Sequence, residues 1–262
     1  MTFDSLTLEV EDAIARVRLT QGDRGNPIDA SLCADLKAVA SACGEDPRVR
    51  CVLIEASGRF FSVGGDLRSL GRDPHELRLF IKNATVDFHA AASRFARMDA
   101  PVIVAVQSLA AGGAVSLAAA ADFCLAARSA RFYAAYQAIG LAIDGGGSHF
   151  LPRRVGSRRA TEFYLRNQTW TAEAACAHGL VNEVVDDAAL TGHALALAAE
   201  LASGPTRAYG EVKNLLASSW DQPLEAQLEL EARAMSRTVR TNDAWAAITA
   251  VAAKQTPTFR GE

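Results

Sequence analysis

The sequence predicts an α/β core followed by a layer of helices, and three observations support this fold class. With 262 residues, of which 50% are hydrophobic, the chain is long enough to bury a large core. In its first part, short apolar or β-branched runs alternate with glycine-bearing loops and helical segments, as in α/β proteins. From about residue 157 onward, apolar residues recur at helical spacing instead.

The expected elements follow from this alternation, taken in chain order. Strand-like runs stand at residues 6–10, 13–19, 49–56, 101–109 and 122–134. Helical runs that complete the strand, loop and helix cycles stand at residues 30–42, 74–98, 114–121 and 144–156. Asp29 is placed to cap the first of these helices, and residues 225–239 form a charged amphipathic helix near the C-terminus. We therefore divide the chain into a core of residues 1–200 and a helical subdomain of residues 201–262.

Composition excludes several classes of function. The formal net charge is −3 and no block of like charges occurs, so binding to nucleic acid is not expected. Residues 100–121 carry no charge, but polar residues and a glycine pair interrupt them, which indicates a buried strand and helix rather than a membrane span. The five cysteines form no C-x-x-C pair and the N-terminus resembles no signal peptide, so we expect a cytoplasmic protein. The histidines show no metal-ligand spacing, and no metal site is expected.

Two glycine-rich turns follow predicted strands and precede predicted helices, at residues 61–67 and 109–114. Such turns expose backbone N–H groups that can bind an oxyanion. Neither turn matches a phosphate-binding loop or a dinucleotide fingerprint.

These turns and their surroundings resemble the crotonase superfamily, also called the enoyl-CoA hydratase/isomerase family. RFFSVGGDL resembles the first oxyanion loop of the family, and PVIVAVQSLAAGGAVSLAAAADFCLA resembles its second oxyanion loop with the following helix. FLPRRVGSRRATEFYLRNQTWTAEAACAHGLVNEVV resembles the segment after the active site. The resemblance implies a spiral core of repeated strand-strand-helix units in two roughly perpendicular sheets, with C-terminal helices that mediate trimers or hexamers.

The resemblance also implies a chemistry. Family members bind an acyl-CoA thioester and stabilise its enolate with two backbone N–H groups, which by position are those of Val63 and Gly113. CoA is then part of the substrate and no further cofactor is required. The residues that the resemblance assigns to substrate binding are Arg24, Asn26, Ser62, Gly64, Gly65, Asp66, Gly112 and Ser116.

The two glutamates with which hydratases activate water are missing from this chain. Their positions hold Ser116 and Tyr136, and neither side chain is an effective base near neutral pH. Asp144 lies just before three glycines, where isomerases, aryl-CoA dehalogenases and ring-closing synthases of the family carry an aspartate. We expect Asp144 to be the base of an enoyl-CoA isomerase; alternatively, it caps the next helix.

The sequence is also compatible with other functions. One alternative is a non-standard hydratase in which Tyr136 or Asp144 activates water. Another is a protein that binds acyl-CoA without catalysis. Dehalogenase chemistry usually also needs a histidine base near the first helix, and the ring-closing synthases usually carry a serine where this chain has Ala142. Fatty-acid, aromatic-acid and isoprenoid breakdown are all compatible contexts.

Overall fold

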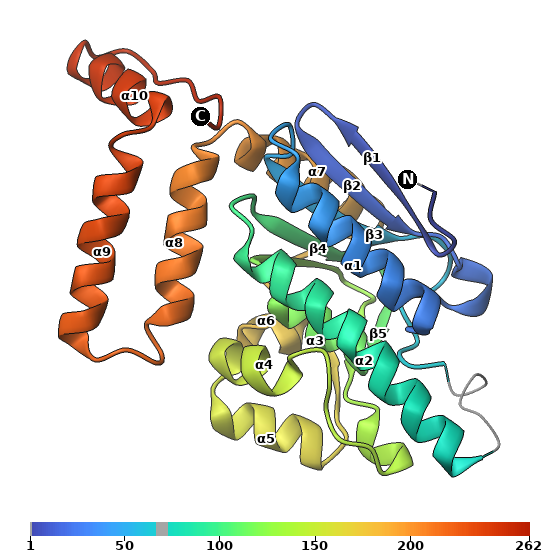
Figure 1. Cartoon of the computed structure of the whole chain (residues 1–262). Coiled ribbons are helices and arrows are strands. Elements are labelled where there is room, and N and C mark those ends of the chain that lie inside the picture. Colours follow the sequence, from blue (N-terminus) through green and yellow to red (C-terminus); the bar gives the residue numbers. More distant parts are fainter. Residues whose placement is uncertain (1, 67–72) are drawn as a thin grey trace.

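The computed structural model describes residues 2–66 and 73–262, so Leu67 at the end of the first glycine-rich motif lies outside the described residues. A six-stranded sheet with the order β1-β2-β3-β4-β6-β9 forms the centre of the fold (Figure 1). Its strands are β1 (Leu6–Glu11), β2 (Ile14–Leu19), β3 (Cys51–Ala56), β4 (Val102–Val106), β6 (Phe123–Ala127) and β9 (Glu183–Val185). Only the β1–β2 pair is antiparallel; every later pair in this sheet is parallel.

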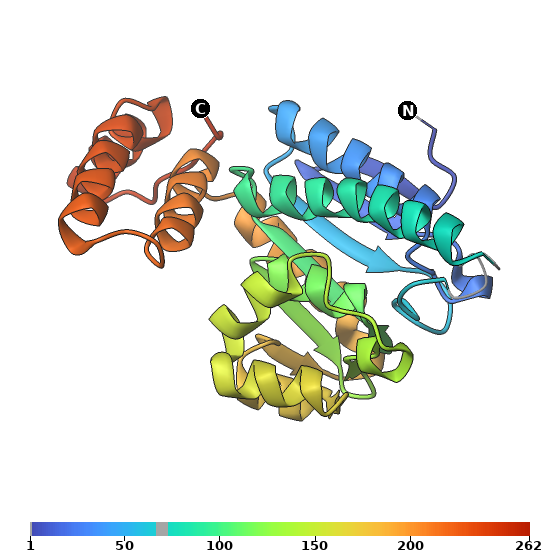
Figure 2. The same ribbon diagram turned by 60° about the horizontal axis from the view of Figure 1, so that its bottom comes forward.

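The central strands are buried on both faces, which explains their continuous apolar sequences. In β3, Val52 and Ile54 join one hydrophobic cluster, whereas Cys51 and Leu53 join the other. Helix α7 (Leu190–Ala202) contributes to the second cluster. Helices α1 (Ala30–Glu45), α2 (Pro74–Arg97) and α3 (Gly113–Ala120) contribute to the first, and both views show α1 and α2 side by side (Figures 1 and 2).

A second, three-stranded sheet contains β5 (Leu109–Ala111), β7 (Arg131–Tyr133) and β8 (Thr169–Thr171). The predicted single strands 101–109 and 122–134 were wrong in this respect, because each divides into one strand of the large sheet and one of the small sheet. The chain turns at Gln107, whose side-chain amide donates to Ala56 O. The region expected to be purely helical also holds β8 and β9.

The remaining elements of the core connect these sheets. They are the short 3₁₀ helices η1 (Gly22–Arg24), η2 (Tyr136–Ile139) and η3 (Asp187–Ala189), and the helices α4 (Gly147–Val155), α5 (Ser157–Leu165) and α6 (Ala172–His178). The predicted cap of α1 is confirmed, since Asp29 Oδ1 accepts a hydrogen bond from Leu32 N at 3.0 Å.

Three C-terminal helices lie to one side of the core in both views (Figures 1 and 2): α8 (Thr206–Ser218), α9 (Leu224–Thr238) and α10 (Asn242–Ala252). Lys213 of α8 anchors them, since its Nζ lies 2.7 Å from Asp122 Oδ2 and donates to Ala100 O. Arg237 of α9 pairs with Glu211 of α8. Helix α7 ends at Ala202, close to the predicted division after residue 200, and that division into domains stays a prediction.

Candidate active site

A cavity of about 660 Å³ opens beside both glycine-rich turns. Apolar side chains dominate its wall. They come mainly from α2 and from the segment 138–143, and are Phe80, Ile81, Ala84, Phe88, Ala138, Ile139, Leu141, Ala142 and Ile143. Of the predicted site residues, Val63, Gly64, Gly65, Asp66, Gly112, Gly113, Tyr136 and Asp144 line this cavity. An apolar pocket with a few polar groups is the usual form of a small-molecule site.

The two glycine-rich turns are joined by backbone hydrogen bonds. Ser62 N donates to Leu109 O at 3.0 Å, and Ala111 N donates to Ser62 O at 3.0 Å. Gly64 has a φ of +85°, and a Cβ at this position would lie 2.9 Å from Ala111 O. Only glycine therefore allows the loops to approach so closely.

Two N–H groups of the first loop are already used in hydrogen bonds within the protein. Val63 N donates to Gly25 O at 2.9 Å, and Gly64 N donates to Ser62 Oγ at 3.1 Å. Val63 is thus not an available oxyanion donor, contrary to the expectation, because the turn before α1 already accepts its N–H. Among the described residues, no hydrogen-bond partner of Gly65 N is found.

The peptide group between Gly64 and Gly65 has a fixed orientation. Gly64 O accepts a hydrogen bond from Ile28 N at 2.8 Å. The peptide is trans, so its C=O and N–H point in opposite directions. The Gly65 N–H consequently points away from Ile28, and Gly65 itself lines the cavity.

The second loop supplies a similar group. Gly112 donates its N–H to Tyr133 O at 2.9 Å, whereas Gly113 N has no partner within the described part of the chain. Gly113 is the first residue of α3, where the N–H groups of a helix are unsatisfied and the helix dipole is positive. A Cβ on Gly113 would lie 3.4 Å from Asp144 Oδ1, so the carboxylate is close to Gly113.

Asp144 is held by Tyr136. The Tyr136 hydroxyl donates to Asp144 Oδ1 at 2.6 Å, from a side chain that is only 8% exposed. Burial and the neighbouring Asp144 charge raise the pKa of Tyr136 well above 10, so the phenol remains a donor and is not a base near neutral pH. The alternative of helix capping is wrong, because Gly146 is the N-cap residue of α4 and no side chain caps that helix.

Two further features shape this part of the site. Ser116 is buried and does not line the cavity; its Oγ donates to the backbone oxygen of Asp144 at 2.8 Å, so it supports the turn rather than a substrate. Ala135, next to Tyr136, has a φ of +68°, and Tyr136 N donates to Ala134 O across it. This tight turn strains a non-glycine residue beside the functional side chains.

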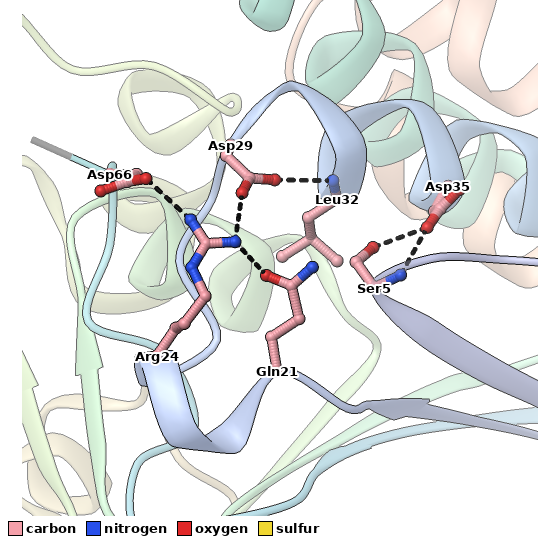
Figure 3. Close-up of polar contacts among 7 residues, drawn as sticks. All are labelled: Ser5, Gln21, Arg24, Asp29, Leu32, Asp35 and Asp66. Carbon is pink, nitrogen blue, oxygen red and sulfur yellow. Dashed lines mark hydrogen bonds and ion pairs between the residues drawn. The ribbon is translucent and has the colours of Figure 1, made fainter. Parts of the chain in front are cut away.

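Three residues predicted to bind substrate instead make hydrogen bonds within the protein. The Arg24 guanidinium donates to Gln21, Asp29 and Asp66 (Figure 3). The Asn26 amide is buried and donates to Ser57 O and Phe60 O. Ser62 is 1% exposed and accepts from Gly64 N. None of these three side chains lines the cavity, because they hold the first loop in its conformation.

His89 is one of several polar residues of the cavity that were not predicted. His89 follows Phe88 on α2 and lines the cavity that also contains Asp144. The apolar residues Ile81, Ala84 and Phe88 recur at helical spacing on the same face of α2, and this signal could have placed His89 at the edge of the wall. Cys33 also lines the cavity, but burial raises the pKa of its thiol to about 12.

Across residues 2–66 and 73–262, no group of three or more His, Cys, Asp or Glu side chains is arranged to hold a metal ion. Within the same residues, none of the helices combines the length and the apolar character needed to cross a membrane.

Comparison with known proteins shows similarity over almost the whole chain. The family model described as enoyl-CoA hydratase/isomerase matches residues 9–262. The 1,2-epoxyphenylacetyl-CoA isomerase of Escherichia coli K12 is 33% identical over 97% of each chain. The 4-chlorobenzoyl coenzyme A dehalogenase-2 of an Arthrobacter species is 30% identical, with 86% of this chain and 82% of the relative covered. A solved enoyl-CoA hydratase/isomerase structure from Mycobacterium abscessus superimposes with a TM-score of 0.92 at 34% identity, covering 98% of this chain and 100% of that one.

Proposed function

Because the chain belongs to the enoyl-CoA hydratase/isomerase family, we propose that it is an enzyme that moves the double bond of an enoyl-CoA thioester. The observation that carries this proposal is the hydrogen bond from Tyr136 to Asp144, which holds one carboxylate close to Gly113. One carboxylate that takes a proton from one carbon and returns it to another is sufficient for this reaction.

In the proposed reaction the thioester oxygen accepts hydrogen bonds from Gly65 N and Gly113 N. Asp144 removes a proton from the α carbon of a 3-enoyl thioester, and negative charge develops on the thioester oxygen as a dienolate forms. The protonated Asp144 then delivers the proton to the γ carbon, which gives the 2-enoyl thioester and regenerates the carboxylate. Each backbone donor contributes about 3 kcal/mol to stabilising such a charge. No cofactor is consumed, and CoA is part of the substrate.

Two features disfavour ordinary hydration. The Ser116 hydroxyl is committed to Asp144 O, and the raised pKa of Tyr136 prevents it from acting as a base. Of the two residues predicted to activate water in a hydratase, Tyr136 and Asp144, this leaves Asp144. An acyl-CoA-binding protein without catalysis is the remaining alternative, and product analysis separates it from an enzyme.

The test is the Asp144→Asn variant assayed with a panel of 3-enoyl-CoA thioesters. The amide keeps the size of the side chain but cannot accept the proton, so kcat should fall about 100-fold or more while thioester binding changes only a few-fold. Exchange of solvent deuterium into the α and γ carbons should fall in parallel. If the parent binds the thioesters but yields no product from any of them, the isomerase proposal is wrong. If Asp144→Asn turns over like the parent, the assignment of the base is wrong.

A second candidate function, hydrolytic dehalogenation of an aryl-CoA, is favoured by His89. In this reaction a carboxylate oxygen of Asp144 bonds to the ring carbon and halide leaves. Water that gives a proton to His89 then hydrolyses the aryl ester and restores the carboxylate. Chloride release from 4-chlorobenzoyl-CoA, lost in His89→Gln and Asp144→Asn, would support this function over isomerisation, and its absence would exclude that substrate.

We also propose that α8, α9 and α10 form subunit contacts in a trimer or hexamer. Large apolar side chains are exposed on these helices and their connections, namely Val212, Leu216, Trp220, Leu224, Leu228, Met235, Val239, Trp245, Ile248 and Val251. An apolar surface of this extent is typical of an interaction site. Light scattering at micromolar concentration should give the mass of three or six chains, and a monomer would contradict the proposal. The cytoplasmic location likewise stays a prediction.

A further inference from the structure

We propose that Arg24 is a positioning residue that holds the Gly65 N–H in place through Asp66, rather than a ligand of the CoA phosphates. This inference rests on the proposed function of Gly65 as an oxyanion donor. Nη2 of Arg24 donates to Asp66 Oδ2 at 2.8 Å, and Nη1 donates to Asp29 Oδ2 at 3.1 Å and to Gln21 Oε1 at 2.7 Å (Figure 3). Asp66 directly follows Gly65 in the chain.

Several contacts join the turn before α1 to the first glycine-rich loop. Val63 N donates to Gly25 O, Ile28 N donates to Gly64 O, and Arg24 binds the Asp66 carboxylate. The first two contacts precede Gly65 in the loop, and the third follows it. Gly65 has no side chain and imposes little conformational restriction of its own. Its N–H direction is therefore set by the contacts on both sides.

The charges around Arg24 explain why its loss would disturb the loop. The side chains of Asp29 and Asp66 are each only 12% exposed, and both bind the same guanidinium. Without the cation these two carboxylates would repel each other in a partly desolvated place. Because Asp66 directly follows Gly65, this repulsion would act on the residue next to the proposed oxyanion donor. Arginine suits this position because its planar guanidinium can donate to two carboxylates at once. A lysine ammonium is a compact charge and is less well shaped to bridge them.

The experiment compares Arg24→Met and Arg24→Lys with the parent on two thioesters of the same acyl group. One is the CoA thioester, and the other is the pantetheine thioester, which lacks the nucleotide phosphates. We expect Arg24→Met to lower kcat about 10-fold or more on both substrates with KM changed less than about threefold, since small misplacement of a catalytic group lowers turnover. Arg24→Lys should recover part of the loss.

Arg48→Met is the matched control. Arg48 is an exposed arginine paired with Asp46 and does not line the cavity, so its variant should match the parent. A phosphate ligand would give a different pattern: Arg24→Met would raise KM for the CoA thioester and leave the pantetheine thioester unaffected. That pattern would overturn the inference.

A second measurement does not depend on turnover. The infrared C=O stretch of a bound, non-reactive acyl-CoA shifts to lower frequency when oxyanion donors polarise the thioester. We expect a smaller shift in Arg24→Met than in the parent. If the parent isomerises no thioester but Arg24→Met still reduces the shift, the proposed function fails and the positioning role stands. An unchanged shift in a folded Arg24→Met or Arg24→Lys protein overturns the positioning role itself.

Discussion

Replacing Tyr136 with phenylalanine should leave the proposed base in place but poorly oriented. The change deletes one oxygen, and with it the 2.6 Å hydrogen bond to Asp144 Oδ1. The side chain is 8% exposed, so water has little access to replace the lost donor. A hydrogen bond to a charged group contributes about 1.5–3 kcal/mol. Since 1.36 kcal/mol corresponds to a factor of ten in rate, kcat should fall about 10- to 100-fold.

The assay is steady-state turnover of the enoyl-CoA that the parent isomerises best, with KM expected to change little. Tyr164→Phe is the control, because the Tyr164 hydroxyl makes no hydrogen bond to Asp144. Tyr164 is also buried, and its ring centroid lies 6.3 Å from that of Tyr136. This control should retain kcat within about threefold of the parent. Equal losses in the two variants, or an unchanged kcat in Tyr136→Phe, would refute the argument that Tyr136 orients the carboxylate.

Two further predictions concern stability. Gly64→Ala should lower Tm by several degrees, because the new Cβ would lie 2.9 Å from Ala111 O at a φ of +85°. Gly65→Ala should leave Tm unchanged, since its Cβ would meet no atom within 4 Å. Equal Tm values for the two variants would contradict the prediction. The buried thiols of Cys33, Cys43, Cys51 and Cys124 have pKa values raised by burial to about 12, against an ordinary value of 9.0. The folded chain therefore keeps protons that the unfolded chain releases, so stability is retained below pH 9 and is lost as the pH rises from 9 toward 12. Urea unfolding under reducing conditions at pH 8 and 10.5 should show a loss of about 1–2 kcal/mol per thiol, with a smaller loss in Cys124→Ala.

Local patterns predicted most of the core. Apolar strands, a capping Asp29 and helical spacing are properties of neighbouring residues, and the α/β class and the first three long helices followed from them. The small sheet was not predicted as such, because β5, β7 and β8 have three residues each and show no period. Strand β9 of the large sheet is equally short and was missed for the same reason. Their pairing depends on contacts between distant segments.

The candidate site was predicted in part for the same reason. The glycine turns were located from their residue types, and Asp144 from its place in the family resemblance. The hydrogen bond that occupies the Val63 N–H was not predicted, since its acceptor, Gly25 O, belongs to a turn that is distant in the sequence. Arg24 was assigned to substrate binding because the two carboxylates that bind it come from different loops. His89 was overlooked because only the packed α2 brings it to the cavity.

The use of main-chain groups as the proposed oxyanion donors affects how such a protein can evolve. A codon change at Gly65 or Gly113 alters a side chain but leaves the amide hydrogen, unless it introduces proline. The capacity to stabilise negative charge is thus largely protected from point mutation, provided that the loops keep their shape. Mutations that change the reaction would then be substitutions of a few side chains, such as Ser116, Tyr136, Asp144 and His89. A lineage can exchange these one at a time and pass between reactions without first losing the step that the reactions share.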